Sequence, residues 1–244
     1  MISIITATYN AGQDLPQLIA SLRAQTSHQF HWIVADGGST DDTLEIIDKN
    51  RDLVKKFIPG PDFGIYDALN KAVSKVETEY YLTLGADDRL KPDAVENYLK
   101  AAKGSKCDFI SAKVLTSAGT MLLPKRGNPF RYGHLAYVSQ HAVGTLIKTS
   151  LHGVIGQYSR RFPIAADRFF ILKAIRHHHC TVQAEDFEAG FYSCDGTSNA
   201  QFYDALLDIF KVDYAVSNRP LFTASVSILR YAINVAKLIL DRFR

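Results

Sequence analysis

Three short polar clusters hold the residues of this sequence that are best suited to chemistry. They are Asp-Gly-Gly-Ser-Thr-Asp-Asp at 36–42, a segment that begins at Asp62, and Gly-Ala-Asp-Asp at 85–88. Glycines let a backbone approach a flat ligand closely, and the carboxylate of Asp36 can accept hydrogen bonds from a base or a ribose. Alone, the first cluster is equally typical of a turn between a strand and a helix that Ser39 or Thr40 would cap.

The adjacent carboxylates Asp87 and Asp88 are candidates for binding a divalent cation. Two neighbouring carboxylates repel each other unless a cation or hydrogen bonds offset their charge. Hard oxygen ligands suit Mg²⁺ or Mn²⁺, which keep part of their water and can share a substrate diphosphate. The alternative is a solvated turn without a ligand.

Each cluster follows a short apolar run that is typical of a β-strand. Such runs alternate with amphipathic helical patterns, the strands at 2–8, 31–35, 53–58 and 80–84 and the helices at 14–25, from 41, at 65–76 and at 92–103. This alternation predicts an α/β fold with a parallel sheet covered by helices. Ligands of such sheets bind beyond the carboxyl ends of the strands, where Thr8, Tyr9, Asp36 and Asp87 are expected to meet.

The second half of the chain carries fewer signals. We expect a hairpin at 114–123, a strand at 142–148, a helix at 164–176, a strand at 181–193 and helices from 199 onward. Asp167 lies near the start of one of these helices. Taken by itself, it is typical of a carboxylate that the helix dipole stabilises.

In combination, the clusters resemble the family 2 glycosyltransferases, which are inverting enzymes of the GT-A fold. The resemblance rests on TATYNAG, DGGSTDD, PDFGIYDALNKAV and YYLTLGADD in that order. It is strong over residues 1–100, weaker over 137–198 and absent over 200–244. The sequence looks most like small bacterial enzymes that build exopolysaccharide, capsule or O-antigen repeats. The implied architecture is a Rossmann-like GT-A domain at 1–198, with a mostly parallel sheet flanked by helices, and a helical C-terminal extension at 199–244.

The resemblance implies a role for each matching residue. Thr8 and Tyr9 match the segment that lines the nucleotide base pocket, and Asp36 matches the carboxylate that holds uracil or ribose. Four further positions fall on the stretch that shapes the base and diphosphate pocket: Asp62, Gly64, Asn70 and Lys71. Asp88 and His141 are also expected to contact the nucleotide sugar. For His141, a contact with the acceptor and a structural hydrogen bond are alternatives. The resemblance therefore implies a nucleotide-sugar donor, and we expect it to be UDP-linked.

The metal and the catalytic base are implied in the same way. Asp87 matches the last carboxylate of the family's Asp-x-Asp motif and is expected to bind Mn²⁺ or Mg²⁺. The first position of that motif is Gly85 here, which is the one argument for an alternative, a catalytically inactive nucleotide-sugar-binding protein. Asp167 matches the base that removes a proton from the acceptor hydroxyl.

Two other enzyme classes fit the sequence less well. A Rossmann dehydrogenase would carry a Gly-x-Gly-x-x-Gly turn after its first strand, and this chain has Tyr-Asn-Ala-Gly there. A sugar nucleotidyltransferase would carry a glycine-rich phosphate loop with basic residues at the same place.

The charge of the chain is concentrated at its C-terminal end. The net charge is +3 from 28 basic and 25 acidic residues, too balanced for a dedicated nucleic-acid-binding protein. Arg219–Arg244 contributes +4 and the first 218 residues contribute −1. Residues 225–244 show one narrow polar stripe at helical spacing, and the wide apolar face must be buried. The alternatives are a membrane surface, the domain itself, or a second subunit in a homodimer.

The expected location follows from several weak signals. The three cysteines lack the spacing of a zinc site and are too few for a disulfide framework, which favours a reducing compartment. The N-terminus lacks the basic region of a signal peptide, and no uncharged apolar run reaches about 18 residues. Because enzymes of similar sequence use lipid-linked sugars as acceptors, we expect a cytoplasmic protein at the inner face of the membrane.

Overall fold

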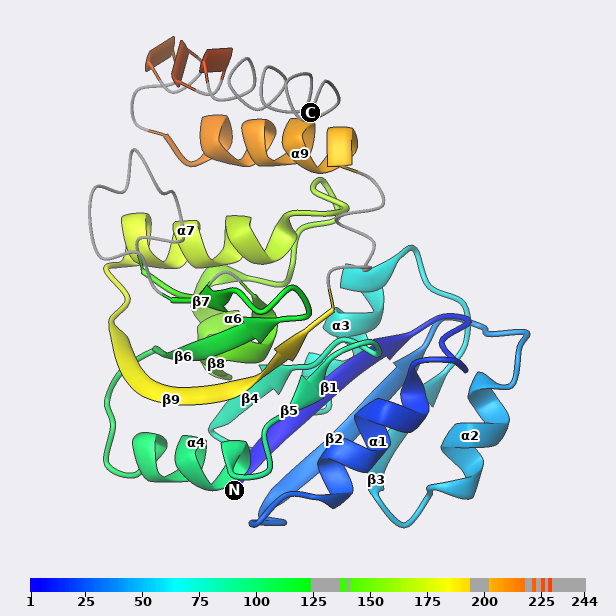
Figure 1. Cartoon of the computed structure of the whole chain (residues 1–244). Coiled ribbons are helices and arrows are strands. Elements are labelled where there is room, and N and C mark those ends of the chain that lie inside the picture. The colour runs from blue at the N-terminus through cyan, green and yellow to red at the C-terminus, as the bar shows by residue number, and fades with distance from the viewer. Residues whose placement is uncertain are drawn as a thin grey trace, which may run out of the picture.

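A computed structural model describes residues 1–123, 137–139, 141–193 and 202–217, together with 221–222, 225–226 and 228–229. The strands are β1 (Ile2–Thr8), β2 (Phe30–Asp36), β3 (Val54–Pro59), β4 (Tyr80–Thr83), β5 (Arg89–Leu90), β6 (Phe109–Thr116), β7 (Met121–Leu122), β8 (Thr145–Lys148) and β9 (Val182–Tyr192). The helices are α1 (Leu15–Arg23), α2 (Thr43–Lys49), α3 (Ile65–Val73), α4 (Ala94–Ala102), α6 (Leu151–Ile155), α7 (Ala166–His178) and α9 (Phe202–Ala215), with a 3₁₀ turn η2 (Ala142–Gly144). Figure 1 shows their arrangement.

The strands form one nine-stranded sheet in the order β3-β2-β1-β4-β8-β6-β9-β5, with β7 paired to β6. The first four strands of that order are parallel, as predicted. Thr8 pairs with Asp36, and Asp36 pairs with Pro59. The carboxyl ends of β1, β2 and β3 therefore meet at one edge, where the polar clusters begin.

The second half of the sheet is mixed. β8 runs antiparallel to both β4 and β6, whereas β9 runs parallel to β6 along most of its length. The strand pairs with the most paired residues, β1 with β2, β2 with β3 and β6 with β9, are all parallel. This confirms the prediction of a mostly parallel α/β sheet.

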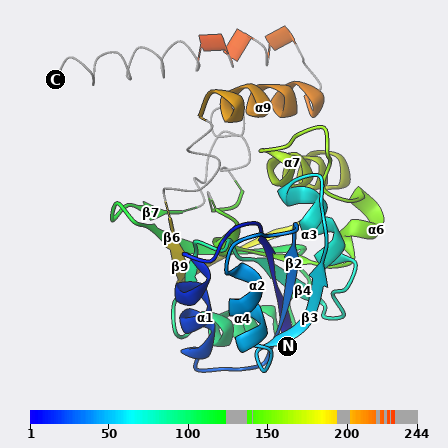
Figure 2. The same cartoon turned by 90° about the vertical axis from the view of Figure 1, so that its right-hand side faces the viewer.

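Helices cover both faces of the sheet and give the molecule two hydrophobic cores, one on each side (Figure 2). One core joins β1 and β2 to α1, α2 and α4 through residues such as Ile4 and Trp32. The other joins the same strands to α3, α6, α7 and α9 through residues such as Ile5 and Ile33. Neighbouring residues of one strand face opposite sides, so β1 and β2 are apolar on both faces and have to be central.

Some local predictions differ from the structure. Neither Ser39 nor Thr40 caps α2, which begins at Thr43, because the Ser39 hydroxyl donates to the Asp36 carboxylate instead. The expected strand at 142–148 begins as the turn η2, and only Thr145–Lys148 is extended. Helix α6 and strand β5 were not predicted, since both are only a few residues long.

The C-terminal part is described as far as α9 and a few residues beyond it. α9 lies against α7 in Figures 1 and 2, and a buried ion pair joins them, with Arg168 Nη2 2.7 Å from Asp213 Oδ1. Most of the amphipathic helix predicted at 225–244 lies outside the described residues. Within the described part, no helix combines the length and apolarity that crossing a bilayer requires.

Candidate active site

Asp36 is the last residue of β2, and its side chain stabilises the conformation of the first polar cluster. Its carboxylate is buried and accepts hydrogen bonds from the Thr8 hydroxyl at 2.9 Å and the Ser39 hydroxyl at 2.6 Å. It also accepts from the backbone N–H groups of Gly38 and Ser39. The structure thus brings Thr8 and Asp36 together as predicted. The hydrogen bonds of the Asp36 carboxylate stabilise the conformation of the loop.

The segment after β1 is tied to the same loop. The Asn10 side chain accepts from the backbone N–H of Thr40 at 2.9 Å, and Asn10 has a left-handed backbone with φ of 49°. Asparagine tolerates that conformation better than most residues. The neighbouring Tyr9 is 66% exposed, so a ligand can reach its side chain.

Asp62 closes this loop from the side of β3. A Cβ atom added to Gly37 would lie 2.5 Å from Asp62 Oδ2, so only glycine fits there without a shift. Asp62 Oδ1 accepts from the backbone N–H of Gly64 at 2.8 Å. Gly64 precedes α3 with φ of 104°, a conformation that favours glycine. The first two polar clusters are therefore in direct contact.

The other two predicted residues of α3 contact protein groups. Asn70 is buried, and its side-chain amide donates to the Tyr158 carbonyl and accepts from the Tyr158 N–H, both at 2.9 Å. Lys71 Nζ donates to the Pro61 carbonyl at 2.8 Å and lies 3.2 Å from Asp67 Oδ2. Asn70 therefore fixes the chain before α7, and Lys71 fixes the loop before α3.

The acidic pair after β4 lies in a poorly solvated place. Burial, and then the charge of Asp88, raise the pKa of Asp87 to about 6. Burial raises the pKa of Asp88 to about 7, against the hydrogen bond that Asp88 Oδ2 accepts from the Gly85 N–H at 3.0 Å. Desolvation disfavours a charged carboxylate, so both groups would gain from a nearby positive charge.

His141 lies beside this pair. Its Nδ1 is 3.6 Å from Asp88 Oδ2, and its ring stacks on Tyr192 with 3.9 Å between the ring centroids. Burial lowers the pKa of His141 to about 4, although the charges of Asp167 and Asp87 act to raise it. The imidazole is therefore neutral near pH 7.

The residues at 85–88 fit a divalent cation. Asp88 Oδ1 is buried and has no hydrogen-bond partner within the described part of the chain, and an orphaned carboxylate oxygen beside a second carboxylate is a suitable hard donor. Among the described residues, no group of three acidic, histidine or cysteine side chains converges on one point. Asp87 and Asp88 would therefore share a cation with water and substrate oxygens, as Mg²⁺ and Mn²⁺ commonly do.

Asp167 lies in the first turn of α7. Its Oδ1 accepts from the Tyr66 hydroxyl at 2.8 Å and from the backbone N–H of Arg168 at 2.7 Å. The negative charge of Asp167 acts on His141, as does that of Asp87.

Three contributors were missed from the sequence. Asp67 is buried and forms ion pairs with Lys71 and Arg160, and Tyr66 contacts Asp167. Both lie within the motif PDFGIYDALNKAV, which is the sequence signal for them. Asp208 of α9 accepts from the backbone N–H groups of Ile164 and Ala165 just before α7, and no sequence signal pointed to this contact.

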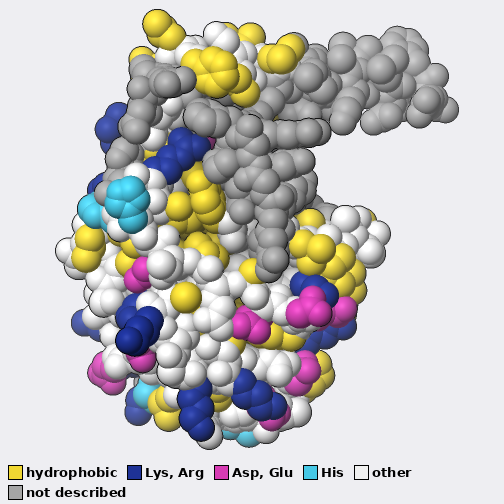
Figure 3. All heavy atoms as spheres, turned by 90° about the vertical axis from the view of Figure 1, so that its left-hand side faces the viewer, with side chains coloured by type: hydrophobic (Ala, Val, Ile, Leu, Met, Phe, Trp, Pro, Cys, Tyr) yellow, Lys and Arg dark blue, Asp and Glu magenta, His cyan; other side chains and the backbone are white. Residues whose placement is uncertain are grey.

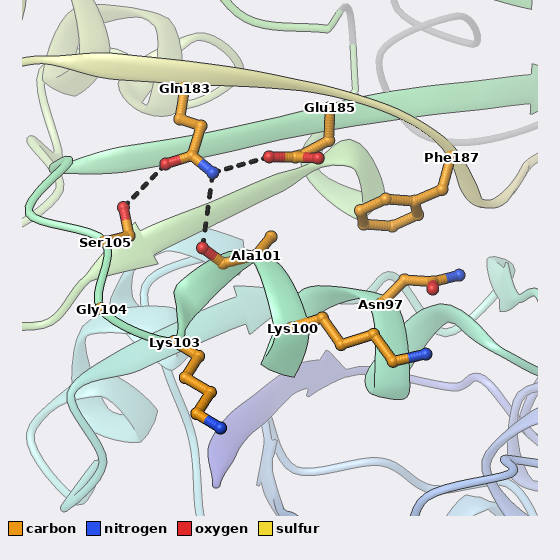
Figure 4. A pocket seen from close by; sticks show the side chains of 9 residues that line it. All are labelled: Asn97, Lys100, Ala101, Lys103, Gly104, Ser105, Gln183, Glu185 and Phe187. Carbon is orange, nitrogen blue, oxygen red and sulfur yellow. Dashed lines mark hydrogen bonds between the residues drawn. The ribbon is translucent and has the colours of Figure 1, made fainter.

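A shallow depression lies elsewhere, between α4 and the first part of β9 (Figure 4). The Gln183 amide donates to Glu185 at 2.6 Å and accepts from the Ser105 hydroxyl at 2.8 Å. These polar side chains of the depression therefore form hydrogen bonds with one another. The lining residues all lie outside the predicted set: Asn97, Lys100, Ala101, Lys103, Gly104, Ser105, Gln183, Glu185 and Phe187. We do not include this depression in the candidate site.

Comparison with known sequences agrees with the geometry. A sequence profile of the family described as Glycosyl transferase family 2 matches residues 3–177. The chain is 30% identical over 181 residues to PGL/p-HBAD biosynthesis glycosyltransferase of Mycobacterium bovis (strain BCG / Pasteur 1173P2), an alignment that covers 71% of this chain and 69% of the relative. It is 37% identical over 123 residues to chondroitin synthase of Pasteurella multocida (strain Pm70), which covers 49% of this chain and 12% of that synthase.

Solved structures show the same fold. S. aureus TarS 1–349 in complex with UDP-GlcNAc superimposes with a TM-score of 0.71 at 19% identity, over 88% of this chain and 65% of that one. The mannosyltransferase PcManGT from Pyrobaculum calidifontis, in complex with GDP-Man and Mn²⁺, gives a TM-score of 0.67 at 15% identity, over 96% of this chain and 75% of that one. This chain thus spans slightly less than two thirds of the TarS structure. These likenesses confirm the predicted GT-A fold.

Proposed function

This chain belongs to glycosyl transferase family 2, and we propose that it is an inverting enzyme that moves a sugar from a UDP-linked donor to a lipid-linked saccharide acceptor in surface polysaccharide biosynthesis. The activity at the level of the family, glycosyl transfer from a nucleotide sugar, follows from the match over residues 3–177. The donor, the acceptor and the role of each residue are our proposal. We further propose that residues 1–198 form the GT-A domain and that 199–244 form a C-terminal extension.

One observation carries the proposal. The buried Asp88 carboxylate lies 3.6 Å from His141, and its Oδ1 has no hydrogen-bond partner within the described part of the chain. The charge of Asp167, on a helix from the other half of the chain, acts on the same histidine. An enzyme that transfers a sugar needs a cation that binds the leaving diphosphate and a carboxylate that takes the proton of the acceptor hydroxyl. These two groups have to lie near each other, because both act on the same sugar.

The donor side is assigned by position and exposure. We propose that the exposed ring of Tyr9 stacks on the base and that the loop held by Asp36 and Asp62 receives the base and the ribose. TarS was solved with UDP and with UDP-GlcNAc, which supports a UDP-linked donor. Lys71, held beside the loop before α3, would contribute positive charge toward the diphosphate.

Asp87 and Asp88 would hold Mn²⁺ or Mg²⁺. The cation supplies positive charge that stabilises the diphosphate as its bond to the sugar breaks. The Mn²⁺ in the structure of PcManGT supports the choice of metal. His141, neutral near pH 7, would offer a hydrogen bond to the donor beside Asp88.

Asp167 would act as the base. Its carboxylate takes the proton of the acceptor hydroxyl, the hydroxyl oxygen forms a bond to the anomeric carbon, and the bond from that carbon to the diphosphate oxygen breaks with its electron pair on the diphosphate. Attack from the face opposite the leaving group inverts the anomeric centre. The chain's own contribution is to hold the carboxylate close to that hydroxyl.

The C-terminal end supports a lipid-linked acceptor at a membrane surface. α9 carries an apolar stripe of Tyr203, Leu207 and Tyr214, which are 64%, 52% and 48% exposed. Figure 3 shows hydrophobic side chains gathered at this end of the molecule. Arg219–Arg244 has a net charge of +4, and basic residues beside an apolar surface favour anionic lipid. A homodimer through the same surface is the competing arrangement.

A binding and turnover experiment tests the proposal. Purified protein is screened against UDP-, GDP-, dTDP- and CMP-linked sugars by thermal shift with and without Mn²⁺, because a ligand that binds the folded state raises its melting temperature. Release of UDP from the best donor then separates an enzyme from an inactive binding protein. We expect a shift with a UDP-sugar and UDP release that increases with Mn²⁺. Binding without release under any acceptor condition would favour the inactive binding protein.

A further inference from the structure

We propose that Tyr66 is a positioning residue that fixes the Asp167 carboxylate, so that Oδ2 of Asp167 is the oxygen that receives the acceptor's proton. This inference rests on the proposed function, in which Asp167 is the base. It adds an assignment that the motif resemblance does not contain, because it links α3 of the first half to α7 of the second through a single hydroxyl group.

The two oxygens of Asp167 have different surroundings. Oδ1 accepts from the Tyr66 hydroxyl at 2.8 Å and from the Arg168 N–H at 2.7 Å. Within the described part of the chain, Oδ2 accepts no hydrogen bond. An oxygen that already accepts two hydrogen bonds is a weaker proton acceptor, since both donors stabilise its negative charge. The geometry therefore leaves Oδ2 for the substrate.

Tyr66 is itself held firmly. Its hydroxyl also lies 3.0 Å from the Ile164 carbonyl, and its ring packs on Tyr158 with 5.6 Å between the ring centroids. Tyr158 is anchored in turn by Asn70. Asp208 of α9 fixes the backbone of Ile164 from the other side. The base is thus positioned by a donor that is itself held by packing and hydrogen bonds, and such positioning favours proton transfer.

The hydroxyl of Tyr66 keeps its proton and therefore cannot itself take the proton of the acceptor. Burial, and then the charge of Asp167, raise the pKa of Tyr66 well above its usual range. The group stays protonated and neutral at any pH at which the enzyme would work. It stabilises the charged form of Asp167 and has no proton exchange of its own to contribute.

The other side chains near Asp167 donate no hydrogen bond to it within the described part of the chain. His141 is sensitive to the charge of Asp167, as is the buried phenol of Tyr158. Arg168 follows Asp167 in sequence, but its guanidinium pairs with Asp213 on α9, with Nε 3.1 Å and Nη2 2.7 Å from Asp213 Oδ1. Tyr66 therefore provides the one side-chain hydrogen bond to Asp167 in the described part of the chain.

Tyr66→Phe tests the proposal, since it removes one oxygen and keeps the ring that packs on Tyr158. Tyr80→Phe is the matched control, because the Tyr80 hydroxyl donates to the Cys107 carbonyl at 2.7 Å on another side of the sheet. The full-length variants are compared for kcat, donor KM, UDP affinity by calorimetry and the pH profile of kcat. UDP-GlcNAc is the first donor used, and the donor selected by thermal shift replaces it if they differ.

We expect kcat of Tyr66→Phe to fall about 10- to 100-fold, with donor KM and UDP affinity unchanged. We also expect its pH profile of kcat to differ from that of the wild type, because the base has lost a hydrogen-bond donor. Tyr80→Phe should match the wild type in kcat and in its pH profile, whatever its melting temperature.

Two results would overturn the assignment. One is a Tyr66→Phe variant whose kcat and pH profile match those of Tyr80→Phe. The other is an equal loss of UDP affinity and kcat, which would mean that Tyr66 shapes the donor pocket. If instead the wild type turns over no donor and Asp167→Asn changes nothing, the proposed function itself fails, and this outcome is distinguishable because it precedes any comparison with Tyr66→Phe.

Discussion

At the scale of single residues, Gly85 decides how the acidic pair is arranged. Its position in the loop corresponds to the first carboxylate of the Asp-x-Asp motif that the sequence resembles, and the structure supplies a reason for the glycine. A Cβ atom there would lie 2.7 Å from Asp88 Oδ2 and 2.8 Å from Asp87 Oδ1. Because the Gly85 N–H also holds Asp88, the two carboxylates cannot both keep their places beside a side chain.

We therefore predict that Gly85→Ala destabilises the fold by about 1–3 kcal/mol and weakens Mn²⁺ binding, because overpacking displaces one of the carboxylates. Gly85→Asp should do so too, although it restores the motif. Gly153→Ala in α6 is the control, since its added Cβ meets nothing within 4 Å and alanine favours a helix. Urea unfolding and calorimetric titration with Mn²⁺ measure both effects. Tighter Mn²⁺ binding by Gly85→Asp would contradict this explanation, because it would show that the glycine deprives the site of a metal ligand.

The raised pKa values of the acidic pair give a second prediction. Burial raises the pKa of Asp88 from its ordinary value of 3.8 to about 7 in the folded chain, so the folded chain holds this proton more tightly than the unfolded chain. The stability that this group contributes is present below about pH 4 and is lost as the pH rises through about 7. The cation-free protein should thus be less stable at pH 8 than at pH 5.5.

Asp88→Asn should remove much of this pH dependence and raise the free energy of unfolding at pH 8 by an amount on the order of 2 kcal/mol. It should also abolish stabilisation by Mn²⁺, which in the wild type replaces the lost proton. The exposed Asp186→Asn serves as the control. Denaturant unfolding at the two pH values, with and without Mn²⁺, makes the measurement. A wild type whose free energy of unfolding is the same at both pH values and does not change with Mn²⁺ would contradict this prediction.

At the scale of elements, α9 supports the helix that carries the proposed base. Asp208 accepts from the N–H groups of Ile164 and Ala165 at 2.9 and 3.1 Å. N–H groups before a helix lack partners within it, so a carboxylate from another helix takes the place of a local cap. The family profile ends at residue 177, so this support comes from outside the matched region.

We predict that Asp208→Ala lowers stability by about 1–3 kcal/mol, because it leaves one buried and one partly buried backbone N–H without a partner, and that it lowers kcat more than it weakens donor binding. Asp208→Asn should retain most of both properties, since its amide oxygen still accepts. Asp204→Ala, on the exposed side of the same helix, provides the comparison. Thermal unfolding and steady-state kinetics report the two effects. Equal behaviour of Asp208→Ala and Asp204→Ala would remove α9 from the positioning of the base.

The sequence predicted the parallel half of the sheet well, because there hydrophobic periodicity and the polar strand ends agree. It missed β5, since two residues paired with the far end of β9 leave no periodic signal. It missed α6, whose five residues include Gly153. The motif positions predict that Asp36 and Asn70 contact the ligand, and this stays a prediction. The hydrogen bonds of both side chains to protein groups could not be predicted from the motif. Partners far apart in sequence, such as Tyr66 and Asp167, are decided by tertiary packing.

At the scale of the whole molecule, the positive charge is concentrated in the C-terminal part of the sequence. The first 218 residues carry −1, and Arg219–Arg244, which follows α9 in the sequence, carries +4. Asp208 and Asp213 of α9 are buried and so present no negative charge to a surface that approaches the apolar stripe of that helix.

We predict that the full chain cosediments with vesicles of phosphatidylcholine and phosphatidylglycerol, and that binding weakens as salt screens the attraction. Deletion of 220–244 should lower binding most, and replacing Tyr203, Leu207 and Tyr214 by serine should lower it further. Uncharged phosphatidylcholine vesicles are the control. A truncated protein that still binds the anionic vesicles would place the contact elsewhere. Loss of a dimer on truncation, without any vesicle binding, would assign the surface to a second subunit.

The central claim is that the site beyond β1, β2 and β4 transfers a sugar with Asp167 as the base. The most direct measurement compares the wild type with Asp167→Asn for UDP affinity and for release of UDP from a UDP-sugar, in the same buffer with Mn²⁺. The account predicts that UDP affinity stays within about twofold while UDP release falls about 10²- to 10⁴-fold. Full UDP release by Asp167→Asn, or no UDP binding by either protein, would contradict it.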